Sequence, residues 1–212
     1  MRIALTFDDG PNTSITPQVL DILEEYGIPA TFFLIAQNIT PESAESVRRA
    51  LKLNCDMENH SVTHGFMNTM TAEQILEETE ECSRRITEIT GREPEFFRPP
   101  FIALNQMMLD CVNLIFISGS GCEDWVPEIS AEERARRTLA NARDGEIILL
   151  HDMQGNINTV EALKTIIPEL KTRGFTFHTV ADLFRTCGIT PLRNRLYSNV
   201  FQTIDRPDLV KA

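Results

Sequence analysis

The sequence predicts an α/β protein built on a parallel sheet, either closed into a barrel or open and doubly wound. Short apolar runs alternate with amphipathic segments along nearly the whole chain. Two of these runs, 32–35 and 147–150, are continuously apolar, which is typical of strands covered on both faces. Because the chain has 212 residues, we expect one domain. The alternation extends over residues 1–188, and the C-terminal tail over 189–212 departs from it and is expected to pack on the same domain.

Seven segments are predicted to form strands. Each is a short, mostly apolar run bounded by polar residues, Gly or Pro. In chain order the predicted strands are 3–7, 30–35, 55–58, 95–97, 113–118, 146–150 and 175–178.

Helix start and stop signals lie between these runs. The first predicted helix is capped by Thr16 and ends at Gly27. A longer helix begins at a capping box over 71–74 and ends at Gly91. Further helices are predicted over 44–51, after a second capping box at 130–133, and over 158–173, where Pro168 favours a kink.

The composition excludes several classes of function. A net charge of −11 argues against a nucleic-acid surface, which needs a basic stripe, and slightly favours a neutral substrate. No apolar run approaches the ~20 residues of a membrane span. The five cysteines are scattered and form no Cys-x-x-Cys pair, so we expect neither a disulfide framework nor a thiolate zinc site.

Polar residues that follow the predicted strands are the candidates for function, because functional groups collect at strand carboxyl ends in α/β folds. Two adjacent acids, Asp8 and Asp9, follow the first strand and repel each other unless a cation or hydrogen bonds offset their charges. His60 and His64 follow the third strand, and their spacing puts both on one face of a helical turn that Gly65 can end. A carboxylate from elsewhere would complete a metal site of two histidines and one acid.

Three later strand ends carry further polar or aromatic residues. Each of these residues, taken alone, has an ordinary structural explanation, such as a turn, a surface ion pair or a core position. It is far less expected by accident that five strand ends all carry residues suited to the same reaction. The fourth histidine, His178, also follows a strand and is interpreted as structural. The later candidates are Arg98 and Phe101, Asp124 and Trp125, and His151.

The motifs TFDDGP, HSVTH, RPPF, DW and LLH resemble, in this order, those of the polysaccharide deacetylase family, over about residues 3 to 185. The family includes chitin deacetylases, peptidoglycan N-acetylglucosamine deacetylases and acetylxylan esterases. The resemblance implies that residues 1–188 form a catalytic domain with a distorted (β/α) barrel of seven to eight parallel strands. It also implies one divalent metal ion, commonly Zn²⁺, with Co²⁺, Ni²⁺ or Mn²⁺ as alternatives.

The resemblance further implies a metal site and a general base. Asp9, His60 and His64 would bind the metal ion. Asp8 would be the general base that takes a proton from the attacking water, and Arg98 would hold it in place.

A general acid and an acetyl pocket are implied in the same way. His151 would protonate the leaving group, and Asp124 would orient its ring. The backbone N–H of Phe101 would face the oxyanion, while Trp125 and Leu149 would line the acetyl pocket.

Two positions depart from the family pattern. Phe101 stands where the family often has Tyr, but the backbone donor is unchanged. Gly121 stands three residues before Asp124, where the family usually has Asp or Asn, so a different shape is expected for this wall of the site.

The predicted reaction is removal of acetyl groups from N-acetylated carbohydrate, such as chitin or peptidoglycan. O-deacetylation of acetylated xylan is the main alternative, because the same residues cleave esters. A non-catalytic carbohydrate-binding relative is a remote alternative, since the base, the acid and the three ligands are all present. A phosphatase of the haloacid dehalogenase type is disfavoured, because the second Asp that it requires would stand at Gly10.

The expected partner is an acetylated glycan, with no nucleic acid and no membrane span, and the sequence predicts no particular oligomeric state. No hydrophobic signal segment precedes the first strand, which by itself favours a cytoplasmic protein. The family resemblance instead implies an extracellular or cell-wall location if a signal has been removed.

Overall fold

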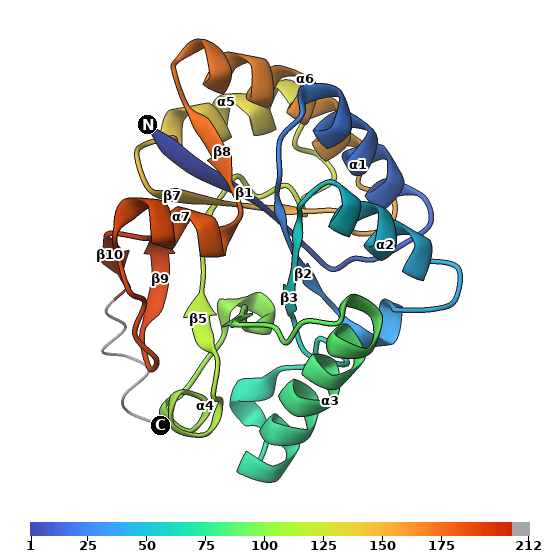
Figure 1. The fold of residues 1–212 in the computed structure, drawn as a ribbon, viewed down its shortest axis with the longest axis vertical. Helices are drawn as coiled ribbons and strands as arrows, with labels where there is room; N and C mark the ends of the chain where they lie inside the picture. Colours follow the sequence, from blue (N-terminus) through green and yellow to red (C-terminus); the bar gives the residue numbers. More distant parts are fainter. Residues whose placement is uncertain (205–212) are drawn as a thin grey trace.

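The computed structural model describes residues 1–204, and its sheet closes into a barrel (Figure 1). The barrel is closed by seven strands in the order β9-β5-β4-β3-β2-β1-β7, because β7 pairs with β9. The predicted barrel is therefore confirmed. The strands are β1 Arg2–Asp8, β2 Thr31–Leu34, β3 Asp56–Asn59, β4 Phe96–Phe97, β5 Ile115–Ile117, β6 Ser120–Gly121, β7 Glu146–His151, β8 Thr176–His178, β9 Leu196–Asn199 and β10 Gln202–Thr203.

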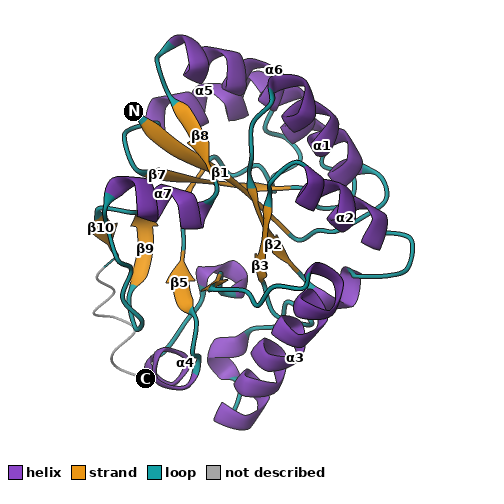
Figure 2. Ribbon diagram, viewed as in Figure 1, coloured by secondary structure: helices purple, strands orange, loops and turns teal. Residues whose placement is uncertain are grey.

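Helices cover much of the outside of the barrel (Figure 2). In Figure 1, α5, α6, α1, α2 and α3 follow one another around it. The helices are α1 Ile15–Tyr26, α2 Ala44–Lys52, α3 Ala72–Thr90, α4 Gln106–Cys111, α5 Ala131–Asn141, α6 Ile157–Thr172 and α7 Val180–Cys187. Among residues 1–204, no helix combines the length and the apolarity that crossing a membrane requires.

Strand β1 is the centre of the sheet. It pairs with β8 near its start, with β7 along most of its length and with β2 near its end, always in parallel. Alternate residues Ile3, Leu5 and Phe7 belong to the large outer core that packs against the helices. Since side chains alternate along a strand, Asp8 faces the barrel interior at the carboxyl end.

Helix α7 packs at the opposite end of the barrel from Asp8. Its Val180, Leu183 and Phe184 form one apolar cluster with Ala4 and other interior residues. This packing fills the amino-terminal end of the barrel with side chains. The carboxyl end is left for polar groups, as in other α/β barrels.

The sequence prediction missed β9, which lies in the predicted tail. It pairs in parallel with β5, and its Asn199 pairs with Glu146 at the start of β7. The Asn199 side chain donates hydrogen bonds to the buried Glu146 carboxylate at 3.0 Å and to the Asp144 carbonyl at 3.1 Å. The strand is short and polar at its end, so its formation depends on these distant partners. Residues 205–212 of the predicted tail lie outside the described residues.

The structure confirms one of the predicted helix caps and contradicts another. The capping box of α3 is present, with Thr71 and Gln74 bonded reciprocally. The predicted Thr16 cap of α1 is wrong, because Thr16 donates its hydroxyl hydrogen to the buried Asp152 instead. The Asn12 side chain accepts the Ile15 N–H at 2.7 Å and satisfies the start of that helix.

Candidate active site

A cavity of about 450 Å³ opens at the carboxyl end of the barrel strands. It contains residues from each of the strand ends that the sequence singled out. Register alone brings two of them together, since Asp8 of β1 lies beside His151 of β7. The cavity is lined by Asp8, Asp9, His60, His64, Pro99, Phe101, Ile102, Ser118, Gly119, Gly121, Trp125, Leu149 and His151.

A sharp change of backbone direction brings both adjacent acids into this cavity. In a continuing strand Asp9 would point away from Asp8, but its φ of 74° turns the chain. The Asn38 amide donates to the Asp9 carbonyl at 2.8 Å and holds the turn. Gly10 follows, and a Cβ there would lie 2.5 Å from the Asp152 carboxylate, so a larger residue would displace that buried side chain.

The loop after β3 brings His60 and His64 together without a helical turn, so that prediction is wrong. Ser61 and His64 have φ values of 66° and 59°, which no α-helix contains. Side chains within the loop stabilise it instead: Asn59 accepts the Ser61 N–H, and the Ser61 hydroxyl accepts the His64 N–H. The two rings still meet edge to face, with centroids 4.8 Å apart.

Glu78 anchors this loop from outside the barrel. Its carboxylate, on α3, accepts the backbone N–H groups of Val62 and Thr63 at 2.9 Å and the Thr63 hydroxyl at 2.8 Å. The sequence analysis missed it because one more Glu on an acidic helix has no local signal of a role.

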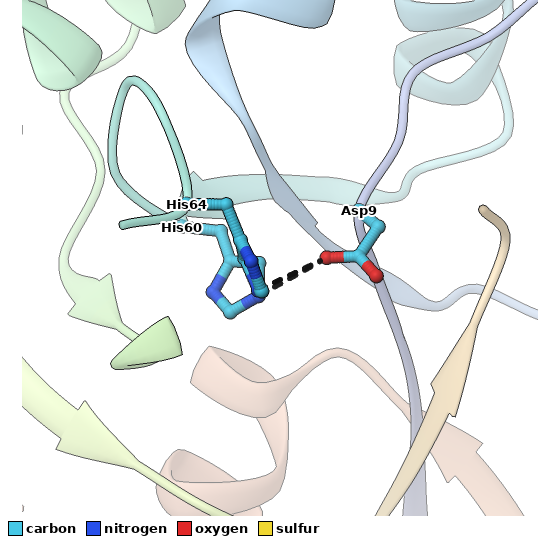
Figure 3. Close-up of side chains that lie close together, drawn as sticks. All are labelled: Asp9, His60 and His64. Atoms are coloured by element: carbon cyan, nitrogen blue, oxygen red, sulfur yellow. Dashed lines mark ion pairs between the residues drawn. The ribbon is translucent and has the colours of Figure 1, made fainter. Parts of the chain in front are cut away.

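The side chains of Asp9, His60 and His64 offer three metal ligands (Figure 3). One Asp9 oxygen lies 3.5 Å from Nε2 of His60 and 3.4 Å from Nε2 of His64. That oxygen is buried and, among the described residues, has no hydrogen-bond partner. Two imidazole nitrogens and one carboxylate oxygen are a common catalytic zinc set that leaves a position open.

The hydrogen bonds and pKa shifts of these three side chains also suit the binding of a metal cation. Nδ1 of His60 lies 2.6 Å from the Arg98 carbonyl, which only accepts, so Nδ1 carries a hydrogen and Nε2 is the ring nitrogen that faces Asp9. Burial, then the charge of His60, lowers the pKa of His64 and favours its neutral ring. Burial raises the pKa of Asp9, but its interactions with His60 and the other histidines outweigh this, and the net shift is downward.

Arg98 fixes the second acid of the pair. Its guanidinium is fully buried and donates to one Asp8 oxygen at 2.6 Å, to the Thr6 hydroxyl at 2.8 Å and to the Ser118 carbonyl at 2.5 Å. It also lies over the Phe33 ring, 4.1 Å from the centroid. The other Asp8 oxygen lies 3.8 Å from Nε2 of His60, beside the ligand cluster.

Asp124 holds His151 at two points. One oxygen accepts the ring Nδ1–H at 2.8 Å, and the other accepts the His151 backbone N–H at 2.8 Å. Burial lowers the pKa of His151, but the hydrogen bond and charge of Asp124 outweigh it and raise that pKa to about 9. The ring therefore carries a proton at neutral pH.

A buried arginine that the sequence analysis missed supports this pair from behind. Arg134 donates to the Asn156 side-chain oxygen at 2.5 Å and the Thr159 hydroxyl at 2.9 Å. Thr159 in turn donates to Asp124 at 2.8 Å, and Asn156 donates to the His151 carbonyl at 2.9 Å. Arg134 looks like a surface residue in a highly charged helix, and only the packing of α5 on α6 buries it.

The predicted wall residues lie around the same cavity. Phe101, Trp125 and Leu149 all line it. Phe101 has a φ of 59°, and no hydrogen bond within residues 1–204 uses its N–H. A Cβ at Gly121 would make an ordinary van der Waals contact with Trp125 at 3.7 Å, so Gly121 is not required by a steric clash at this wall, where the family usually has an acid or amide.

Comparison with known proteins gives a consistent picture. A family model described as polysaccharide deacetylase matches residues 1–115. A bifunctional xylanase/deacetylase of Pseudobutyrivibrio xylanivorans is 47% identical over 199 residues, which is 93% of this chain. The chain spans only 33% of that relative's length.

Two further proteins align over nearly their whole length. A peptidoglycan-N-acetylglucosamine deacetylase of Bacillus cereus is 34% identical and is matched over 86% of this chain and 88% of its own. The structure of a family 4 acetyl xylan esterase from Clostridium thermocellum, in complex with a cobalt ion, has a TM-score of 0.91 and 37% identity. It covers 94% of this chain and 99% of the esterase.

We predict that the chain binds about one divalent metal ion. Loss of a residue that only supports a metal ligand typically costs ~10–100-fold in metal affinity, and His64→Ala, which removes a ligand itself, should cost more than that. The measurement is elemental analysis after dialysis against limiting zinc. His178→Ala is the matched control, because His178 lies on β8 and its Nε2 is 2.9 Å from the Thr176 hydroxyl. Equal metal content in both variants would contradict the ligand assignment.

We also predict that Arg134→Leu lowers the free energy of unfolding by about 2–4 kcal/mol, because several buried acceptors lose their donor. Arg136→Leu removes only an exposed ion pair with Glu133 and should cost no more than about 1 kcal/mol. Urea denaturation of both variants measures the difference. A similar loss in the two would mean that the Arg134 hydrogen bonds do not stabilise the fold.

Proposed function

Because the chain belongs to the polysaccharide deacetylase family, we propose that it is a metal-dependent hydrolase that removes acetyl groups from carbohydrate. One observation carries the proposal. A three-ligand cluster, an arginine-held carboxylate and an aspartate-held histidine all face one cavity of about 450 Å³. These are the parts that acyl transfer from an acetyl group requires.

Asp9, His60 and His64 would hold the metal ion, for which we propose zinc. The cobalt ion of the acetyl xylan esterase supports a divalent ion in this family. Bound there, the ion would polarise the acetyl carbonyl and lower the pKa of the attacking water.

Asp8 is proposed as the general base. Arg98 occupies one of its oxygens at 2.6 Å, so the other oxygen is free to accept a proton from water. The ion pair with Arg98 also fixes the orientation of the Asp8 carboxylate.

The charge that develops on the acetyl oxygen needs a donor at the cavity wall. We assign that role to the Phe101 N–H, which the left-handed backbone of Phe101 leaves without a partner among the described residues. A donor that is already in position stabilises an oxyanion without reorganisation at the moment of reaction.

His151 is proposed as the general acid. Its ring is largely buried, protonated at neutral pH and oriented by Asp124, so its Nε2–H is available to the leaving group. Trp125 packs edge to face against this ring at 5.5 Å and limits its rotation.

For the substrate we propose an N-acetylglucosamine-containing glycan, such as chitin or peptidoglycan. The match to a peptidoglycan-N-acetylglucosamine deacetylase over 86% of this chain and 88% of that protein supports it, as does the protonated His151, which suits an amine leaving group. O-acetylated xylan is a second candidate, favoured by the xylanase/deacetylase and acetyl xylan esterase relatives. Acetate release from chitin oligomers, peptidoglycan and acetylxylan, with metal and with chelator, decides between them.

Asp8→Asn is expected to keep the metal ion but to lose about 10²–10⁴-fold in kcat, since it removes a general base and no ligand. Metal content and acetate release are measured on the same preparation. Loss of the metal together with the activity would instead make Asp8 a ligand.

His151→Ala is expected to lower kcat/KM for an N-acetyl sugar more than for the matched O-acetyl sugar, because an amine leaves poorly unless it is protonated. Equal losses on the two substrates would assign His151 a role in positioning instead. The quantity compared is kcat/KM, which reports lost transition-state stabilisation.

The pH dependence gives an independent check of the same role. Because the pKa of His151 is raised to about 9, its acid form is present below that pH and activity should fall as the pH rises through it. Asp124→Asn removes the charge that raises this pKa, so the alkaline limb should move to lower pH.

A further inference from the structure

Four aromatic side chains are strongly exposed among residues 1–204, and three of them gather at the mouth of the active-site cavity. Phe101 and Trp125 line the cavity itself. The third, Phe66, stacks on Phe101 with ring centroids 4.2 Å apart and an interplanar angle of 15°. The fourth, Phe201, lies at the turn between β9 and β10.

Phe66 is held outside the apolar core by its own loop. The side chain is 57% exposed, whereas its neighbour Met67 is buried and anchors the segment. Phe101 is 55% exposed although it stacks on Phe66. Exposed apolar surface of this kind beside a polar site is typical of a ligand-binding groove.

The stacked pair is continuous with the catalytic centre. The Phe101 ring meets the His64 ring edge to face at 4.6 Å, and His64 is a candidate metal ligand. His64, Phe101 and Phe66 therefore form a line of rings that leads outward from the cavity. Phe66 itself is one ring beyond the cavity wall.

We propose that Phe66 and Phe101 form a binding platform for a pyranose ring of the glycan, next to the sugar that loses its acetyl group. This rests on the proposed function. The cavity can hold the reacting sugar, but a polymer has to continue past its mouth. A pyranose packs its apolar C–H face on an aromatic ring while its hydroxyl groups stay in water.

The residues around the platform fit an uncharged partner. The segment from Gly65 to Met70 contains no Lys, Arg, Asp or Glu. Binding at Phe66 therefore depends on ring stacking and on chain length. A substrate too short to reach Phe66 gains nothing from it, whereas a longer one gains binding remote from the reacting bond.

The test compares Phe66→Ala with wild type on N-acetylchitopentaose, on the disaccharide and on 4-nitrophenyl acetate. We expect kcat/KM for the pentasaccharide to fall roughly three- to tenfold, as for one lost aromatic contact, with little change on the aryl acetate. Phe66→Tyr keeps the ring and should restore the activity. Phe201→Ala is the matched control, since Phe201 is 51% exposed and lies at another place on the surface.

An equal loss on all three substrates would overturn the platform, because it would mean that Phe66 only supports the catalytic centre. No loss on either N-acetylchitopentaose or O-acetylated xylopentaose would overturn it as well. An O-acetylated xylopentaose, run in parallel, identifies which glycan the platform accepts.

Binding measured by calorimetry separates this proposal from the proposed function. N-acetylchitopentaose and xylopentaose are titrated into wild type, Asp8→Asn and the Asp8→Asn, Phe66→Ala double variant. Weaker binding in the double variant supports the platform even if wild type releases no acetate, in which case only the proposed function fails. Unchanged affinity, or no binding of either oligosaccharide, overturns the platform.

Discussion

The site depends on one buried residue, Arg98, which acts through both its side chain and its backbone. Its guanidinium holds Asp8 at 2.6 Å, and its carbonyl accepts from Nδ1 of His60 at 2.6 Å. One residue therefore orients the proposed base and a candidate metal ligand at the same time. A fully buried guanidinium is costly without partners, and Asp8, Thr6 and the Ser118 carbonyl offset that cost.

Backbone strain is concentrated around the same cavity. Asp9, Ser61, His64 and Phe101 all have positive φ values, which are uncommon outside glycine. Each such residue costs of order 1–3 kcal/mol and persists only where its surroundings determine it. Here the Asn38 amide, the Ser61 hydroxyl and Glu78 supply those surroundings, so the barrel and α3 stabilise a conformation that the loops would not adopt alone.

The alternation of apolar runs and helices predicted a parallel α/β sheet with polar groups at its strand ends, and the family resemblance predicted that the sheet closes into a barrel. The apolar runs of β1 and β7 are local signals, and the register in which the two strands pair places Asp8 and His151 side by side. What the sequence did not predict depends on contacts between distant segments. β9 is a strand only because β5 and β7 pair with it, and Arg134 is buried only because α5 packs on α6.

The proposed base and the proposed acid lie on two sides of one small cavity, and each faces a side chain of opposite charge. Asp8 faces the positive charge of Arg98, whereas His151 faces the negative charge of Asp124, which raises the pKa of His151. Separate networks hold them, one inside the barrel and one at the interface of α5 and α6. Neither network shares a residue with the other, so the proposed base and the proposed acid are each held by their own set of hydrogen bonds, as suits a reaction that takes a proton on one side of the cavity and gives one on the other.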